Sequence, residues 1–173
     1  GKEVEIKNPN DANDLKIGMV HQHFKLVDVF TVLENIMLGK ETTKGIFLDY
    51  ERAKKDIKDL CKKYNLKVDL DKQIKDITVS MQQKVEIVKM LYRDADILIF
   101  DEPTAVLTPH EIDELMKIIR GFSREGKTII IITHKLDEIK QIADRCTILR
   151  RGKLVGTVDV KEASIEKLAE MMV

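Results

Sequence analysis

Two short apolar runs with polar residues directly after them restrict the fold of this chain more than any other feature. The first, Ile97–Phe100, runs into Asp101 and Glu102. The second lies within residues 127–134 (KTIIIITH), where six β-branched residues in a row are followed by His134. Runs of this length and composition are typical of strands buried on both faces of a parallel sheet. A third candidate strand, Ile17–Val20, also ends in a polar cluster.

The order of the remaining segments predicts an α/β fold. Within residues 28–95, apolar side chains recur at three- and four-residue spacing with dense charge between them, which indicates helices. Another helix is expected from Pro109, where Thr108 and Glu111 have the spacing of a capping box. A hairpin turning at residues 151–152 and a terminal helix follow. We therefore expect a parallel sheet with a helical insertion.

Composition narrows the function classes. The 173 residues contain 30 basic and 30 acidic side chains, so no net field draws the chain to nucleic acid, and no nucleic-acid partner is expected. Cys61 and Cys146 match no metal or redox spacing, which fits a reducing cytosol. No stretch approaches the ~18–20 apolar residues that cross a bilayer.

Polar side chains follow all three candidate strands: Gln22 after the first, Asp101 and Glu102 after the second, and Thr133 and His134 after the third. Ligands of open parallel sheets bind at the carboxyl ends of the strands. An aspartate there can hold Mg²⁺ through water, a glutamate can deprotonate an attacking water, and histidine and glutamine can complete the site. The alternative is that these are solvated acids at a strand end. The sequence favours a nucleotide site.

One segment matches a phosphate-binding pattern but lies in the wrong context. Residues 121–128 (GFSREGKT) satisfy G-x-x-x-x-G-K-S/T. Such a loop cradles phosphates only when it follows a strand and opens a helix. Here a helical stripe precedes the segment and a strand follows it. We interpret Gly121 as the break at the end of the helix and Gly126 as the turn into the strand.

Four motifs, in order, resemble those of ABC-type ATPases: MVHQHF the Q-loop, ITVSMQQKVEIVKML the signature segment, ILIFDEPTAVLT the Walker B motif and D-loop, and IIITHK the H-loop. The resemblance is to the first ATPase domain of fused importers for simple sugars or nucleosides. It assigns Gln22 to the Q-loop and to the Mg²⁺ shell, Asp101 to Mg²⁺, Glu102 to the catalytic base and His134 to the H-loop.

The signature segment departs from the family pattern. The resemblance places it at residues 78–82 and implies that Thr78, Ser80 and Gln82 act on ATP bound by a partner domain. Val79 and Ser80 replace the two usual glycines, which implies a weakened opposite site. We expect Ser80, with Gln83, to cap the helix that follows. Thr108 replaces the usual D-loop aspartate.

The fold class implied by the resemblance is a truncated P-loop NTPase of the ABC type. Residues 1–28 and 96–173 would form a partial RecA-like ATPase core, and residues 29–95 the helical subdomain. We expect the Walker A loop upstream of Gly1, so this chain alone would be inactive. In the family, the strand that leads into the Walker A loop would lie beside residues 128–132. Without it, the apolar strand 128–132 would form an exposed edge of the sheet. We expect this edge to pair with a second copy of the chain, or the C-terminal part to be displaced.

The function implied is the ATP-binding subunit of an importer for a simple sugar or nucleoside, with ATP and Mg²⁺ as cofactors. Its partners would be a second ATPase domain and a membrane-spanning permease, and its location the cytoplasmic face of the membrane. The contact with the permease would involve Phe24, Lys25, Leu26 and Val27, unless these only pack within the subdomain. Two alternatives remain: an ATPase of this type with a soluble role, and an ATP-inert protein-interaction module.

Overall fold

The computed structural model describes residues 3–173, which form two compact units, one ending at Ile132 and the other comprising Thr133–Val173. The first unit contains α1 (Pro9–Asp14), β1 (Ile17–Val20), α2 (Val32–Met37), β2 (Thr43–Lys44), β3 (Phe47–Leu48), α3 (Tyr50–Lys63), a 3₁₀ turn (Ile74–Asp76), α4 (Val79–Tyr92), β4 (Ile97–Asp101), α5 (Pro109–Arg124) and β5 (Thr128–Ile132). The second contains α6 (Leu136–Ile142), β6 (Arg145–Arg150), β7 (Lys153–Asp159) and α7 (Ile165–Met172).

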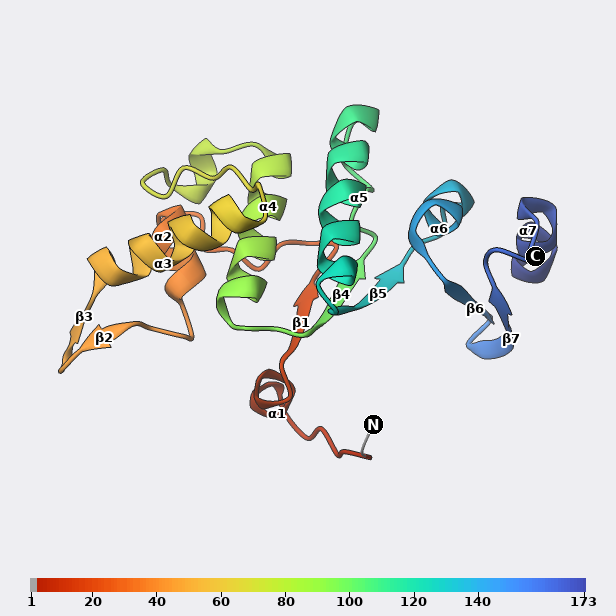
Figure 1. Ribbon diagram of the computed structural model, residues 1–173, viewed down its shortest axis with the longest axis horizontal. Coiled ribbons are helices and arrows are strands. Elements are labelled where there is room, and N and C mark those ends of the chain that lie inside the picture. The colour runs from red at the N-terminus through yellow and green to blue at the C-terminus, as the bar shows by residue number, and fades with distance from the viewer. Residues whose placement is uncertain (1–2) are drawn as a thin grey trace. The chain divides into compact units, whose positions relative to one another are not determined.

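A three-stranded parallel sheet in the order β1-β4-β5 forms the centre of the first unit (Figure 1). Val20 is paired with Phe100, and Asp101 with Ile132, so the carboxyl ends of the strands meet at one edge. The predicted parallel sheet is therefore confirmed. Among residues 3–173, β5 has a strand partner on its β4 side only, while β6 and β7 form a sheet of their own.

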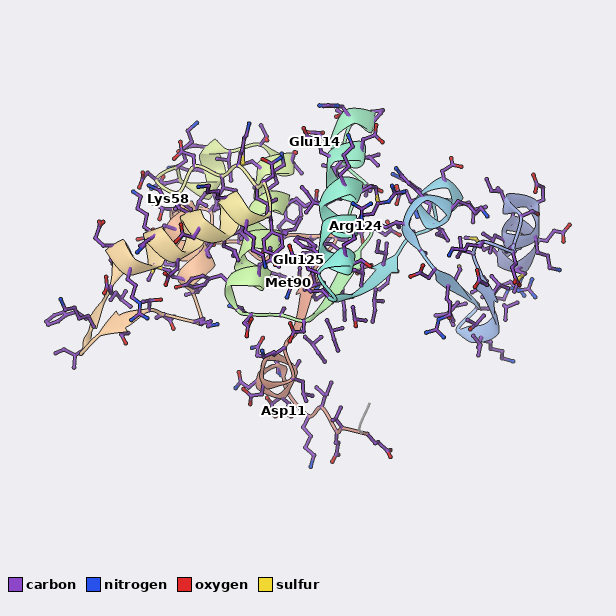
Figure 2. All side chains as sticks on the ribbon, in the orientation of Figure 1. Asp11, Lys58, Met90, Glu114, Arg124 and Glu125 are labelled. Atoms are coloured by element: carbon purple, nitrogen blue, oxygen red, sulfur yellow. The ribbon has the colours of Figure 1, made fainter. Side chains whose placement is uncertain are left out.

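One face of the sheet is closed by apolar packing. Leu98 and Phe100 are fully buried, and Val20 lies beside Phe100 in the register. Met90 extends from α4 towards β1 (Figure 2), where the absence of a side chain on Gly18 leaves room for it. The same strands carry partly exposed residues on the opposite face, so β4 alternates between half-buried and buried positions.

The helices predicted in the middle third are confirmed as α2, α3 and α4, which pack together (Figure 1). The helix α4 is buried along most of its length, because apolar residues lie on nearly all its sides. The hairpin β2–β3 was not predicted. It turns at Gly45, which has a φ of 66°, and its tip exposes Ile46 and Phe47 to solvent.

The helix caps confirm one prediction and correct two. Thr108 and Glu111 form the expected capping box of α5. The prediction that Ser80 caps α4 is wrong: the cap is Thr78, whose extended backbone lets its hydroxyl accept a hydrogen bond from the Met81 N–H. The end of α5 is not at Gly121, because the helix continues through Arg124.

The second unit contains the predicted hairpin. Strands β6 and β7 are antiparallel, and Arg151 and Gly152 at their turn have φ angles of 49° and 73°. Two consecutive left-handed residues produce the tight turn that matches the twist of the strands. The ammonium group of Lys140 on α6 donates to the carbonyls of Val160 and Ala163 and so ties α6 to the segment before α7. Among residues 3–173 the longest apolar stretches of helix are too short to span a membrane.

Candidate nucleotide site

The carboxyl ends of β1 and β4 bring two predicted site residues together. The Nε2 of Gln22 donates to the Oε2 of Glu102 at 3.2 Å. Asp101, the last residue of β4, is half-buried and lies directly before Glu102. An amide and a carboxylate, 80 residues apart in sequence, therefore meet at the edge of the sheet where parallel folds bind ligands.

The backbone of Glu102 adopts a left-handed conformation with a φ of 44°. This conformation costs free energy for any residue with a Cβ. It is held by hydrogen bonds on both sides, since the Glu102 N–H donates to the Ile132 carbonyl at 2.8 Å and its carbonyl accepts from the Ala105 N–H at 3.2 Å. Strained residues of this kind concentrate at functional sites, where the surroundings fix them.

Residues 133–134 continue from β5 into the second unit. The Thr133 hydroxyl donates to the Glu138 carboxylate at 3.1 Å and accepts from the Lys135 N–H, which holds the residues that lead into α6. His134 lies between these two bonded residues, two positions after Ile132, the partner of Asp101 in the sheet. Its contact with the γ-phosphate stays a prediction.

The signature residues all have partners within this chain. Thr78 caps α4, and the Gln82 amide donates to the carbonyls of Ile74 and Ile77. The N–H and hydroxyl of Thr108 lower the pKa of Glu111 below its ordinary value, and the Ser80 hydroxyl adds a smaller effect in the same direction. The action of these residues on a partner's ATP therefore stays a prediction.

Three buried polar residues next to the site were not predicted. Gln83 and Glu86 on α4 and Asn35 on α2 are almost entirely removed from solvent. Gln83 donates to the carbonyl of Pro103, directly after Glu102, and Glu86 accepts from the backbone N–H of Lys25. The sequence around Glu86 did not mark it as buried, because Gln82, Gln83 and Lys89, one turn away on α4, are also polar.

The segment GFSREGKT joins α5 to β5, as expected for a false match to the phosphate loop. Gly126 forms the turn with a φ of 86°. The ammonium group of Lys127 donates to the Ala95 carbonyl at 2.6 Å and pairs with Asp96 at 3.3 Å. These residues precede β4, so Lys127 lies at the edge of the sheet opposite to Glu102.

The donor groups at the site fit a hard cation such as Mg²⁺. Oxygen ligands are available from Asp101, Glu102 and the Gln22 side chain. Across residues 3–173, no three His, Cys, Asp or Glu side chains gather closely enough to hold a metal by themselves. Mg²⁺ generally takes one or two carboxylates and completes its shell with water and substrate phosphates, so the small donor set agrees with it.

A parallel sheet with acids at its carboxyl edge and a helical insertion is the arrangement of an ATP-binding cassette. Residues 2–105 match the family model described as ABC transporter, and the chain belongs to this family. Members of the family are generally ATP hydrolases that use ATP and Mg²⁺.

The relatives found by sequence include import proteins. The chain is 60% identical over all its 173 residues to the nucleoside import ATP-binding protein NupA of Lactococcus lactis and 56% identical to the guanosine import ATP-binding protein NupO of Bacillus subtilis. It spans 34% of the length of each, about a third of these curated relatives.

Solved structures share the fold. An ATP-binding cassette of an ABC transporter, MJ1267 in its ADP conformation, superposes with a TM-score of 0.77 at 21% identity, covering 99% of this chain and 70% of that one. The protein cbiO1 of Clostridium perfringens, part of an ABC transporter complex, gives a TM-score of 0.70 at 26% identity, covering 91% of this chain and 61% of that one. The predicted α/β cassette fold is thus confirmed.

Proposed function

We propose that this chain forms part of the ATP-binding component of an importer for a nucleoside or a simple sugar. The observation that carries the proposal is the 3.2 Å hydrogen bond between Gln22 and Glu102 beside Asp101, in a chain of the ABC transporter family. The 60% identity to a nucleoside import protein supports the nucleoside class, and the similarity to sugar import proteins supports the second.

The side chains divide the chemistry between them. Asp101 would hold Mg²⁺ through water, and Glu102 would accept a proton from the attacking water. Gln22 orients the Glu102 carboxylate through its hydrogen bond. His134 would contact the terminal phosphate, and Thr78, Ser80 and Gln82 would complete the site of a partner domain. Bound Mg²⁺ and ATP supply charge neutralisation and the phosphoryl group.

The partners proposed are a second ATPase domain and a membrane-spanning permease, met at the cytoplasmic face of the membrane. The segment Phe24–Val27 follows Gln22 directly and would face the permease. A relative of known structure, the cassette MJ0796, is described as a dimer, and this supports a partner domain for the signature residues.

A second candidate is an ATP-inert interaction module. It is favoured by the position of Lys127, which bonds to Ala95 and Asp96 and so gives GFSREGKT no role as a phosphate loop. We propose that the 173 residues alone do not hydrolyse ATP. Hydrolysis by the chain alone, abolished by Glu102→Gln, would contradict this.

The transport proposal is tested in a hybrid protein. The 173 residues replace the matching third of the Lactococcus lactis nucleoside import protein, to which they are 60% identical, in a strain that lacks that protein. Uptake of labelled nucleoside and labelled ribose is measured. Restored uptake that Glu102→Gln abolishes supports the proposal. A folded hybrid that is made in normal amounts and restores neither uptake contradicts it.

A further inference from the structure

The segment after β1, residues 22–27, is held at three points, and we call it the Gln22 loop. At its start, Gln22 bonds to Glu102. In its middle, the Lys25 N–H donates to the Oε1 of Glu86 at 3.1 Å. At its end, the Val27 N–H donates to the Oδ1 of Asn35 at 2.7 Å, and the Asn35 amide donates back to the Val27 carbonyl at 3.1 Å. Helices α4 and α2 therefore fix the backbone that presents Gln22.

Helix α4 also holds the other half of the site. Gln83 lies three positions before Glu86, which places both side chains on one face of the helix. Its Nε2 donates to the Pro103 carbonyl, and Pro103 follows Glu102 directly. Two buried side chains on α4 thus bond to the backbone three positions after Gln22 and to the backbone one position after Glu102.

The burial of Glu86 needs a reason. Its side chain is 6% exposed on a helix whose other buried residues are mostly apolar, and a buried carboxylate is unfavourable unless it is paired. Lys89 lies three positions after Glu86 on α4, on the same side of the helix. Burial lowers the pKa of Lys89, and the charge of Glu86 opposes that effect. An apolar residue of the same length would fill the space without this penalty.

We propose that Glu86 is a positioning residue: by accepting the Lys25 N–H it fixes the Gln22 loop on α4, so that Gln22 reaches the Glu102 carboxylate. The proposal rests on the proposed function, since it assigns Glu86 a part in the same site. Glu86 does not touch the reacting groups, and its effect passes through the loop backbone. Gln83 holds Pro103, next to Glu102, and Asn35 holds Val27 at the end of the Gln22 loop.

Two variants of similar size separate the hydrogen bond from charge and packing. Glu86→Gln keeps an oxygen that accepts the Lys25 N–H, whereas Glu86→Met fills the space without an acceptor. Both remove the negative charge beside Lys89, so that effect is common to the pair. In the hybrid importer protein we expect Glu86→Met to lower kcat roughly 10- to 100-fold, with the KM for ATP changed less than about threefold. Glu86→Gln is expected to retain the unmodified kcat within about threefold.

A second measurement needs no activity. In NMR spectra of the 173-residue chain, we expect the Lys25 amide proton to exchange slowly, and the Gln22 side-chain amide signal to shift in Glu86→Met but not in Glu86→Gln. An unprotected Lys25 amide in the unmodified chain overturns the proposal, even if the Met variant fails to fold. Equal kcat values for the Met and Gln variants also overturn it.

The two proposals fail in different ways. If Glu102→Gln leaves ATP hydrolysis by the hybrid intact, the proposed function is wrong. If Glu102→Gln abolishes hydrolysis while Glu86→Met behaves as Glu86→Gln does, only the role of Glu86 is wrong.

Discussion

The side chain of Met90 on α4 occupies the space that a Cβ on Gly18 of β1 would need. Such a Cβ would lie 2.8 Å from the Met90 Sδ and 3.0 Å from the Ala95 Cβ. The sheet and α4, which carries Gln83 and Glu86, therefore approach each other as closely as a glycine in β1 allows.

Gly18→Ala is expected to destabilise the protein by about 1–3 kcal/mol, because the added methyl group forces Met90 out of its position. The free energy of unfolding is measured by urea denaturation. Gly121→Ala is the matched control. Gly121 lies inside α5, where a methyl group would enter open space, so alanine there is expected to stabilise the helix by roughly 0.5–1 kcal/mol. Equal effects of the two changes would contradict the close approach at Gly18.

Replacing Glu102 should separate backbone strain from chemistry. Glu102→Gly and Glu102→Ala both remove the carboxylate, but only glycine adopts the φ of 44° at little cost. We expect the glycine variant to be more stable than the alanine variant, with a free energy of unfolding about 1 kcal/mol higher. Both variants of the hybrid importer protein should lose ATP hydrolysis. Indistinguishable unfolding curves would show that position 102 is unstrained in solution.

The capping box of α5 predicts a pH-dependent stability. Thr108→Val keeps the side-chain shape and removes the hydroxyl, at an expected cost of about 1 kcal/mol, while Thr108→Ser retains the cap.

The bonds from Thr108 lower the pKa of Glu111 in the folded state below its ordinary value of 4.5. The resulting stabilisation is present above that value and is lost as the pH falls below 4.5 through the folded pKa. The difference in stability between Thr108→Val and the unmodified chain should therefore shrink between neutral and acidic pH. Thermal unfolding at several pH values measures it, and a constant difference would argue against the cap.

The edge of β5 predicts self-association of the isolated chain. Ile130 and Ile132 are 45% and 49% exposed on the strand that ends the sheet, and such an edge can pair with a second copy. Ile130→Lys should reduce the average molecular mass that analytical sedimentation gives at high protein concentration. Ile46→Lys, at the 92% exposed tip of the β2–β3 hairpin, adds the same charge away from the edge and should have no such effect. A monomeric unmodified chain would contradict the pairing.

Where sequence reasoning succeeded, the signal was local. β1 was predicted at Ile17–Val20 and is observed there, because a short apolar run bounded by polar residues has few other solutions. The capping box at Thr108 was readable since its partners are three positions apart. The same local signal, Asn8 with Asp11 around Pro9, was available for α1 and was missed.

The remaining features depend on distant partners. Glu86 bonds to a backbone group 61 positions away, and Gln83 to one 20 positions away, so helical periodicity does not reveal these partners. The cap of α4 was misplaced because Thr78 and Ser80 both have suitable side chains. The extended backbone at Thr78 decides between them, and that is set by how the preceding segment packs.

Lys127 shows how a pattern search would mislead mutagenesis of this protein. Its ammonium group bonds to Ala95 and Asp96 and helps to hold the amino edge of the sheet, although its place in GFSREGKT marks it as a phosphate-binding lysine. Replacing it would weaken the fold, and any resulting loss of nucleotide-dependent activity would be mistaken for a lost ligand contact. The order of helix and strand around the letters, and not the letters, identifies what such a lysine does.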